Sequence, residues 1–526
     1  MKLRDYQQDA CDAITAAWED HQSVMAVLPT GTGKTEIFVH LAGNWEQGRV
    51  LIVAPLIQLV SQAVKKVTKR TGIAPGIEQA SQTSCELEYM RSPFVVGSKQ
   101  TLTGASKRYK KLVNIGLVII DECHLATTDL YKEMLDYFRD RGAKVLGLTA
   151  TPNRHDGIGM DNIFDHCAIN MGISDGVDQG WLVRAKAKCV QLESLDLSLV
   201  STKGSKGDFK DGELANVMER DEVVFEIADV AARESENLKT VIFCACVNEA
   251  QAVAERLVDR YGKRADWICG DKIRCPDEKR QEVLDSFTED PEGLQFVCNV
   301  GILCLGWDFP GLEHIVMARP TKSLGLFTQI FGRGTRPLDG VVDFEGSTAE
   351  SRLAAIEASD KTHFRITDLV DSSMQHKICT SADVLAGNEG VAITARARKL
   401  MQQAGSAIDV EGALTEAELQ LKVEEKQRKK REEEERQRRL RDSVEAQARY
   451  RSFSVNPFDT NHVSDGVASK KGPRMTFGKH KGKLLRDIPT SYLDWLMREA
   501  NISQPWLRNS IAKEHRERVQ PMRTSL

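Results

Sequence analysis

The chain has 526 residues, of which 41% are hydrophobic, and a formal net charge of −4 at pH 7. This length exceeds what one hydrophobic core organises, so we expect about three domains. The near-neutral charge excludes a surface that is basic throughout, and no apolar run is long enough to span a membrane. The 12 cysteines include no Cys-x-x-Cys pair and the chain starts without an apolar signal region, so we expect a cytoplasmic protein.

Short apolar runs, rich in Val, Ile and Leu, recur along the chain. They are nearly continuous rather than alternating, which is typical of parallel strands buried on both faces. The first set lies at residues 23–29, 50–55, 93–98, 117–122 and 145–150, and the second at 240–245, 265–270, 294–300, 314–319 and 363–370. The sequence therefore predicts an α/β protein with two parallel-sheet domains in tandem, at residues 1–172 and 173–380.

The first apolar run leads into the sequence LPTGTGKTEIF, which opens a helix. Glycines let backbone N–H groups turn toward phosphate oxygens, and the helix N-terminus adds its dipole. The predicted phosphate loop comprises Thr30, Gly31, Thr32 and Gly33. We expect Lys34 to reach the β- and γ-phosphates of ATP, and Thr35 to hold Mg²⁺. Leu28 stands where the strict pattern has another glycine, but strand, loop and helix follow in the required order.

The fourth run ends in LVIIDECH, which places Asp121 and Glu122 after a buried strand. A carboxylate beside a phosphate loop can hold Mg²⁺, partly through water, and its neighbour can orient or deprotonate the attacking water. We therefore predict that Lys34, Asp121 and Glu122 are catalytic. His124 either couples this site to other motifs or is an ordinary capping histidine.

The sequence QIFGRGTRP at residues 329–337 carries Arg333 and Arg336 with no acidic residue among them. Arginines at this spacing on a helix present one face. An arginine delivered from a neighbouring domain can accelerate phosphoryl transfer by about 10³–10⁵-fold. We therefore expect both to reach across a cleft onto ATP bound by the first domain; a pair on a helix surface is the alternative.

The composition changes after about residue 395. Residues 416–451 contain no Gly or Pro, and they mix both charge signs at a spacing that supports an exposed helix. They lack a clean apolar seam, so a solvated helical spacer at 395–451 is favoured over a coiled coil. A linker at 452–472 then leads to a small basic module at 473–526.

From Arg451 onward the chain carries 14 Lys and Arg residues against 7 Asp and Glu residues. Phe477 lies among basic residues that could grip a nucleic-acid backbone while the ring stacks on a base. These residues are Lys479, Lys481 and Lys483. The alternative is a protein-docking module in which Phe477, Tyr492 and Trp495 are simply the core.

The motifs resemble those of superfamily 2 helicases over roughly residues 1–371. In chain order they are LRDYQ, PTGTGKT, VAPLIQLVSQ, VGSKQTL, DECH, LTATP, NVGILCLGWDFP and QIFGRGTR. The resemblance implies two RecA-like domains that use ATP and Mg²⁺ to act on nucleic acid. It also implies residue roles: Arg4 and Gln7 read adenine; Ser98, Gln100 and Thr101 contact nucleic acid; His124, Thr149 and Thr151 couple nucleotide state to closure; Gly306 and Asp308 sense ATP and the strand; Gln329, Arg333 and Arg336 form the finger motif.

Two further stretches, residues 319–337 and 206–218, are similar to RadD-like DNA helicases. Those proteins carry a Cys-rich zinc element after the second domain, whereas this chain has only Cys379 there, so we expect no zinc. The C-terminal FGKHKGKLLRDIPTSYLDWL resembles a module appended to some bacterial exonucleases and phage proteins. We therefore expect a bacterial or phage-encoded protein.

The resemblance favours an ATP-dependent helicase or translocase on single-stranded or forked DNA, in repair, recombination or replication. An RNA helicase of the same architecture is an alternative. A third hypothesis is an ATP-gated clamp or protein remodeller that does not unwind. We expect no membrane association, and a protein partner for the C-terminal module remains open.

Overall fold

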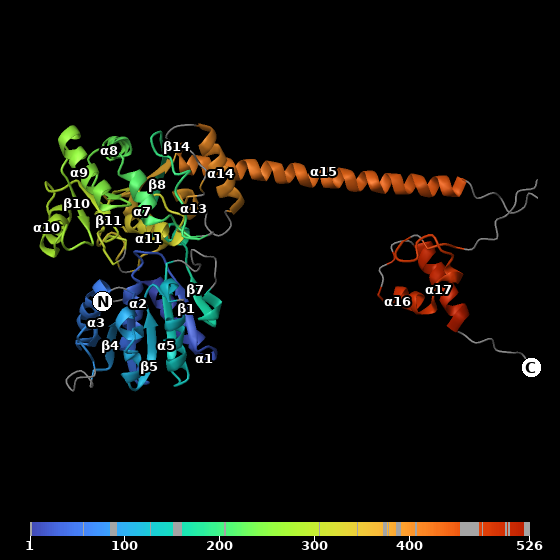
Figure 1. Cartoon of the computed structure of the whole chain (residues 1–526), viewed down its shortest axis with the longest axis horizontal. Helices are drawn as coiled ribbons and strands as arrows, with labels where there is room; N and C mark the ends of the chain where they lie inside the picture. The colour runs from blue at the N-terminus through green and yellow to red at the C-terminus, as the bar shows by residue number, and fades with distance from the viewer. Residues whose placement is uncertain are drawn as a thin grey trace, which may run out of the picture. The chain divides into compact units, whose positions relative to one another are not determined.

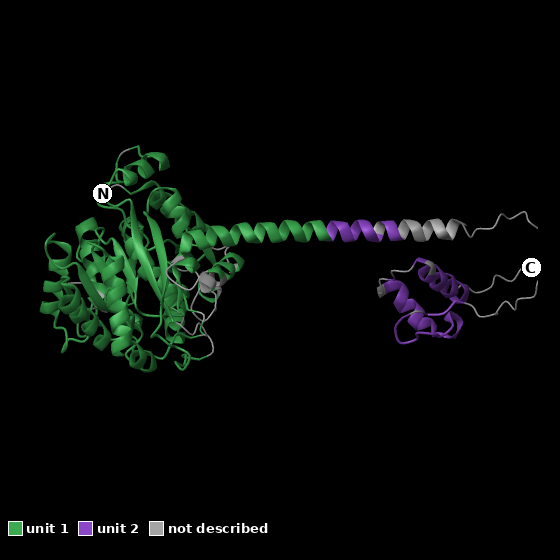
Figure 2. Cartoon of the chain, turned by 90° about the horizontal axis from the view of Figure 1, so that it is seen from above, with its two compact units in different colours: residues 1–431 green, residues 432–526 purple. Residues whose placement is uncertain are grey.

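The computed structural model describes residues 3–55, 57–84, 92–126, 128–150, 160–204, 207–304, 306–344, 346–371, 376, 378–385, 391–404, 408–452, 473–475, 477–499, 502 and 505–519. The chain divides into two compact units, residues 1–431 and 432–526, which are described separately here (Figure 2). None of the helices in the described ranges combines the length and the apolar character that a membrane span requires.

The first sheet has seven strands in the order β3-β4-β2-β5-β6-β1-β7, and all neighbouring strands are parallel (Figure 1). The strands are β1 (Ser23–Val27), β2 (Arg49–Ala54), β3 (Gly76–Glu78), β4 (Phe94–Ser98), β5 (Ile115–Ile120), β6 (Lys144–Thr149) and β7 (His166–Asn170). The helices of this half are α1 (Asp5–Asp20), α2 (Lys34–Gly43), α3 (Ile57–Thr71), α4 (Lys99–Thr103) and α5 (Asp129–Arg139), with 3-10 turns η1 (Arg108–Lys111), η2 (Cys123–Leu125) and η3 (Met160–Asn162).

Successive residues of the strands enter apolar clusters on opposite faces of the sheet. Val24 of β1 packs in the cluster that includes Phe38 of α2 and Val60 of α3. Met25, the next residue, packs in a separate cluster with Tyr131 of α5. Both faces are therefore buried, which is the physical reason that these strands read as continuous apolar runs.

The second sheet has the order β10-β11-β9-β12-β13-β8-β14. Its strands are β8 (Arg184–Leu192), β9 (Thr240–Phe243), β10 (Ala265–Cys269), β11 (Phe296–Val300), β12 (His314–Met317), β13 (His363–Asp371) and β14 (Ile408–Asp409). All pairs are parallel except β14 with β8. The helices of this half, up to residue 385, are α6 (Ile173–Asp178), α7 (Asp211–Met218), α8 (Asp221–Glu234), α9 (Val247–Tyr261), α10 (Asp277–Thr288), α11 (Leu324–Gly334), α12 (Ala349–Glu357) and α13 (Ser381–Leu385). The predicted fold of two tandem parallel-sheet domains is confirmed.

The apolar runs missed β8 because its residues alternate between exposed and buried positions. The chain leaves the first sheet at Asn170 and enters the second at Arg184, on either side of the expected boundary at residue 172. The sequence prediction ended the second domain at residue 380, and this end is wrong. Ile408 of β14 pairs with Cys189 of β8, so the second sheet continues beyond it.

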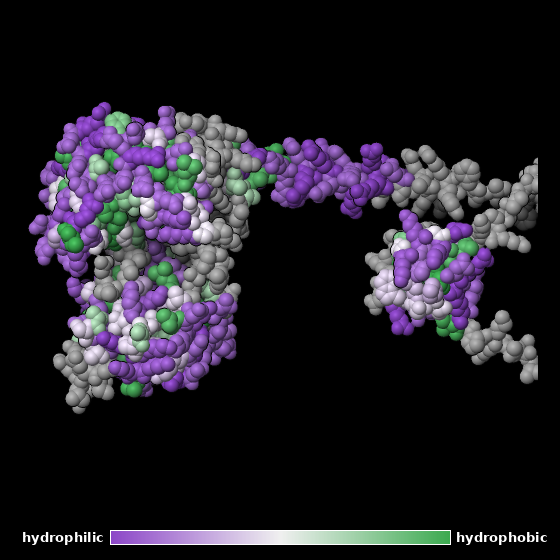
Figure 3. Space-filling view, viewed as in Figure 1, coloured by the Kyte–Doolittle hydropathy of each residue, from purple (hydrophilic) through white to green (hydrophobic). Residues whose placement is uncertain are grey.

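The helical spacer also begins later than residue 395. Helix α14 (Val391–Ala404) is separate from α15 (Val410–Ser452). The first turns of α15 bury Val410, Ala413 and Ala417 in the core of the first unit, because these small apolar residues recur on one face. Beyond them α15 is hydrophilic (Figure 3), with ion pairs four residues apart such as Lys429–Glu425 at 2.8 Å.

The second unit ends in a small module with its own core. A bridge joins Arg474 to Leu484, and η4 (Leu485–Asp487), α16 (Thr490–Glu499) and α17 (Pro505–Val519) follow. The core residues are Met475, Leu485, Ile488, Leu493, Leu496, Leu507 and Ile511. The linker expected at 452–472 lies almost entirely outside the described residues.

His314, at the start of β12, gives the second sheet a specific sensitivity to acid. Its side chain is fully buried, with Nδ1 2.8 Å from Ser235 Oγ and Nε2 2.9 Å from Thr367 Oγ1. Burial lowers its pKa to about 3. As pH falls, the imidazole of His314 is therefore protonated in the unfolded chain at a higher pH than in the folded one. The free energy of unfolding then decreases below about pH 6.5, by up to about 1.4 kcal/mol per pH unit. Thermal melting from pH 7 to pH 4 should show a smaller loss in His314→Gln than in the wild type; equal losses would contradict this.

Candidate nucleotide-binding site

The loops that follow β1, β5 and β6 meet at one edge of the first sheet. Val27 of β1 pairs with Thr149 of β6, and Ile120 of β5 pairs with Gly147 of the same strand. The carboxyl ends of these parallel strands therefore lie side by side. Ligands bind at this edge in open α/β sheets.

The loop after β1 has the backbone of a phosphate cradle. Gly31 and Gly33 have φ angles of 88° and 76°, in the left-handed region that favours glycine. A Cβ on Gly33 would lie 2.6 Å from Gln7 Nε2. That same nitrogen donates to the carbonyl of Thr32 over 2.9 Å, so Gln7 holds the loop in place.

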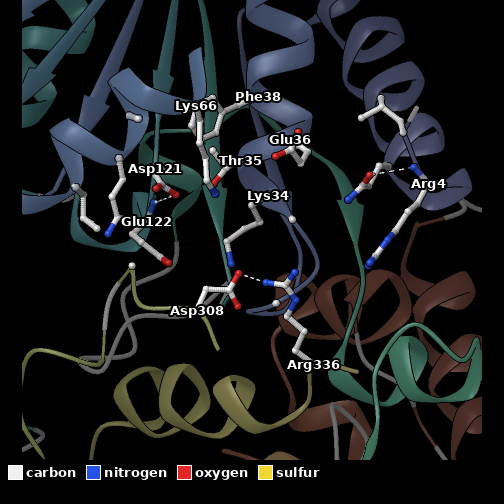
Figure 4. Close-up of a pocket in the computed structure, with 18 of the residues that line it drawn as sticks. Arg4, Lys34, Thr35, Glu36, Phe38, Lys66, Asp121, Glu122, Asp308 and Arg336 are labelled. Atoms are coloured by element: carbon white, nitrogen blue, oxygen red, sulfur yellow. Dashed lines mark hydrogen bonds and ion pairs between the residues drawn. The ribbon is translucent and has the colours of Figure 1, made fainter. Parts of the chain in front are cut away.

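Lys34 and Asp121 line the same pocket beside this cradle (Figure 4). Lys34 Nζ donates to the carbonyl oxygens of Leu28 and Pro29 over 3.2 and 3.4 Å. Burial, and next the charge of Glu122, raise the pKa of Asp121 to about 6. A carboxylate destabilised in this way is suited to a divalent cation, and Mg²⁺ takes oxygen ligands such as Asp121 and the hydroxyl of Thr35.

Glu122 is held in a polar network that reaches both sheets. Its φ of 50° is unusual for a residue with a side chain, and it directs Glu122 into the pocket. His124 Nδ1 lies 3.4 Å from Glu122 Oε2 and 3.0 Å from Thr149 Oγ1. From the second sheet, Gln329 Nε2 lies 3.4 Å from both Glu122 Oε2 and His124 Nε2. This network joins the residue that would direct the attacking water to both halves of the unit.

Arg333 and Arg336 line the same pocket, but their surroundings differ from the sequence prediction. Helix α11 ends at Gly334, so the two arginines do not share a helix face. Arg336 pairs with Asp308 and, over 3.0 Å, with Asp339. The acidic partners of Arg336 thus come from outside residues 329–337, and no signal in the sequence marks these pairs.

Arg333 is anchored to the loop after β11. Its guanidinium donates to the carbonyl of Cys304 over 2.9 Å and to that of Trp307. Burial lowers its pKa, and the charges of Glu122 and Asp121 oppose that shift. Arg333 lines the same pocket as Asp121 and Glu122, the predicted catalytic carboxylates of the first sheet.

Glycines allow the two halves to touch beside the pocket. A Cβ on Gly31 would lie 3.5 Å from the carbonyl oxygen of Gly332, and a Cβ on Gly332 would lie 2.6 Å from Thr30 Cβ. A Cβ on Gly306 would collide with Leu59 of α3. The result is a pocket of about 250 Å³ with walls from both sheets (Figure 4).

Comparison with known proteins agrees with this arrangement. Residues 1–154 match the family "Type III restriction enzyme, res subunit", and residues 221–337 match "Helicase conserved C-terminal domain". The two matches fall on the two sheets, in that order. The chain belongs to the superfamily 2 helicases.

Relatives of this helicase include proteins of Saccharomyces cerevisiae, Escherichia coli and Sulfurisphaera tokodaii. "Putative ATP-dependent helicase IRC3" of Saccharomyces cerevisiae is 27% identical over 434 residues, covering 77% of this chain and 60% of the yeast protein. The "Type I restriction enzyme EcoAI endonuclease subunit" of Escherichia coli is 26% identical, covering 63% of this chain and 44% of the relative. "DNA 3'-5' translocase XPB2" of Sulfurisphaera tokodaii is 33% identical over 158 residues, which are 30% of this chain and 32% of the relative. The helicase thus matches less than two thirds of each relative's length.

Solved structures share the fold. The Type ISP restriction-modification enzyme LlaBIII bound to DNA aligns with a TM-score of 0.50 and 17% identity, covering 71% of this chain and 32% of LlaBIII. A fragment of a "putative HsdR subunit" from Vibrio vulnificus aligns with a TM-score of 0.51 and 21% identity, covering 71% of this chain and 65% of the fragment. In the second unit, residues 468–503 match the family "Putative quorum-sensing-regulated virulence factor".

Asp343 and Lys66 are among the pocket residues of the helicase that sequence reasoning missed. Asp343 pairs with Arg4 over 2.7 Å, and this ion pair joins the predicted adenine-reading segment to the second half. Within that segment, Arg4 N donates to Gln7 Oε1 over 3.0 Å. Lys66 of α3 lines the pocket, and its pKa is lowered because the surrounding protein displaces water from it. Lys66 follows Gln62, another lining residue, by one helical turn, and this spacing was the available signal.

The predicted nucleic-acid residues of the first sheet divide by exposure. Ser98 is fully buried, and its hydroxyl accepts from the N–H of Thr101 over 3.3 Å to cap α4, so its contact with nucleic acid stays a prediction. Gln100 is exposed and Thr101 is half-buried. Thr151 lies outside the described residues.

The structure leaves the zinc expectation as a prediction. Within the described ranges, no group of three or more His, Cys, Asp or Glu side chains is arranged to hold a metal ion. The backbone N–H of Cys379 donates to the carbonyl of Thr321 over 2.7 Å.

Proposed function

We propose that this protein is an ATP-dependent motor that moves along or unwinds DNA. The observation that carries the proposal is the pocket whose walls come from both sheets, with Lys34, Asp121 and Glu122 on one side and Arg333 and Arg336 on the other. A site divided in this way links phosphoryl transfer to the relative position of two domains. Single-stranded or forked DNA is the proposed substrate, and repair, recombination or replication the proposed setting.

The first sheet holds ATP and prepares the attack in this proposal. Backbone N–H groups of residues 30–33 bind phosphate oxygens, and Lys34 neutralises their charge. Asp121 and Thr35 are the residues that would hold Mg²⁺, which supplies a positive charge that polarises the phosphates. Glu122 orients the attacking water and accepts its proton.

The second sheet supplies the remaining charge and the coupling. Arg333 and Arg336 line the pocket. A change of side-chain rotamer would move either guanidinium from its present partner toward a γ-phosphate. Gln329 contacts Glu122 and His124, and His124 contacts Thr149. A change at the γ-phosphate therefore reaches both sheets through direct contacts, and closure with ATP and opening after hydrolysis would move the protein along a strand.

We propose DNA and not RNA as the substrate because proteins described as acting on DNA are among the relatives. A DNA translocase and a restriction-enzyme subunit are among the proteins that the first unit resembles. The chain spans only part of each relative, so we extend this preference to the present protein as a hypothesis.

The test is a side-by-side comparison of ATP turnover with single-stranded DNA, duplex DNA, forked DNA and RNA. Single-stranded or forked DNA should stimulate most, because the proposed motor tracks one strand. Glu122→Gln is the control. It should bind ATP without hydrolysing it, so any turnover that remains in its preparation measures contaminating ATPase activity. Stronger stimulation by RNA would move the assignment to an RNA helicase. Stimulation by DNA without strand separation or movement would favour a clamp.

A further inference from the structure

The C-terminal module exposes aromatic rings instead of burying them. Its core is built from Met, Leu and Ile residues. Phe477 is 37% exposed and Trp495 is 50% exposed, although both are large apolar side chains. Of the three residues that the alternative assigned to the core, Phe477 and Trp495 therefore lie outside it, whereas Tyr492 packs against it. Exposed aromatic groups that gather in one place mark a binding surface.

Three rings of the module, those of His480, Tyr492 and Trp495, are in contact, and Phe477 lies beside them in the chain. The ring of Tyr492 lies between its neighbours, with its centroid 4.6 Å from that of His480 and 5.5 Å from that of Trp495. Gly478 has a φ of 72°, and a Cβ there would lie 2.8 Å from the Tyr492 hydroxyl, so the backbone next to Phe477 lies against Tyr492. We call Phe477, His480, Tyr492 and Trp495 the aromatic surface.

Three exposed cations stand in the same loop. Lys479, Lys481 and Lys483 alternate along a turn that closes when Met475 N donates to the carbonyl of Lys483 over 2.9 Å. No carboxylate of the described residues pairs with these lysines. The turn also contains Gly478 and Gly482, both in the left-handed region, and it carries the three lysines on the same short loop as Phe477 and His480.

We propose that the aromatic surface and these lysines form a second contact for single-stranded nucleic acid, outside the motor. Bases can stack on the rings of Phe477, Tyr492 and Trp495, while the lysines bind the phosphates between them. A strand offers flat apolar faces and negative charges at close intervals, which is the pattern that this surface complements. A docking protein would have to present both features together. The inference rests on the proposed function, because it assumes a nucleic-acid substrate.

The test compares the full-length wild type with a Phe477→Ala, Trp495→Ala variant. Fluorescence anisotropy with labelled oligothymidylate should show binding weakened about tenfold or more, because base–aromatic contacts are lost. ATP turnover at saturating oligonucleotide should stay unchanged, since no motor residue is altered. Both side chains are exposed, so the thermal melting of the module should also be retained.

A second variant tests the lysines against a control with the same change in charge. Lys479→Gln, Lys481→Gln, Lys483→Gln should reduce the slope of log affinity against log salt by about 2. The matched control, Arg508→Gln, Lys513→Gln, Arg516→Gln, changes exposed residues of α17 and should reduce it less.

The outcomes separate this proposal from the proposed function. If oligothymidylate stimulates the wild type and both variants bind it as tightly as the wild type, the second contact is refuted and protein docking becomes the role of the surface. Equal losses in the lysine variant and its control would also overturn it, because net charge alone would then explain the effect. If no polynucleotide stimulates or binds the wild type, the proposed function itself has failed.

Discussion

Replacing Lys34 with alanine should abolish ATP hydrolysis. Lys34 begins α2 after the glycine cradle, and its amino group donates to the carbonyl oxygens of Leu28 and Pro29. Without it, the β- and γ-phosphates lose the cation that neutralises them in the transition state. Phosphate release in the presence of single-stranded DNA measures the effect, and it should fall to background.

Two controls show that this loss is specific. Lys65→Ala removes an exposed lysine that does not line the pocket, and its turnover should match the wild type. Glu122→Gln should also stop turnover while keeping ATP binding, which separates the chemical step from the cradle. Near-normal turnover in Lys34→Ala would show that the glycine loop is not the phosphate site.

Replacing Arg333 with alanine should leave ATP binding nearly intact and reduce turnover by about 10³-fold. The first sheet provides the cradle, whereas Arg333 approaches from the second sheet and is electrostatically coupled to Glu122 and Asp121. Its effect should therefore appear in the maximal rate and not in nucleotide affinity. Single-turnover hydrolysis, with affinity measured separately by a fluorescent nucleotide, gives both values.

Arg336→Ala is the matched comparison for Arg333→Ala. Arg336 is paired with Asp308 and Asp339, so its alanine variant also frees two carboxylates near the pocket. If Arg333→Ala keeps full turnover and Arg336→Ala loses it, the main finger is Arg336. Full turnover in both variants would refute the assignment of a finger to this motif.

The sequence predicted the parts of the site that depend on short segments. A glycine loop between a strand and a helix, the pair Asp121 and Glu122 after a buried strand, and two arginines in one motif all have local signals. Their convergence followed from the order of strands in a parallel sheet. In the structure one pocket is lined by members of all three motifs, namely Gly31, Gly33, Lys34, Asp121, Glu122, Arg333 and Arg336.

Features that depend on distant contacts could not be read from the sequence. Arg4 and Asp343 are far apart in the chain, and nothing local marks them as partners. Ser98 looked accessible because hydroxyls suit phosphate contacts, but its place at the start of α4 buries it. Strand β14 is too short to leave a pattern, and it pairs only because β8 exposes an edge. Trp495 was ambiguous because an apolar ring suits a core and a binding surface equally.

The narrow contact between Thr30 and Gly332 has a thermodynamic consequence. A pocket completed by two separate sheets binds its nucleotide with an affinity that includes the free energy of bringing those sheets together. Any second ligand that favours the same arrangement must then tighten the nucleotide by the same factor by which the nucleotide tightens that ligand. This reciprocity can be measured without any turnover, by titrating one ligand at fixed concentrations of the other in Glu122→Gln. The coupling free energy obtained from either direction should be the same.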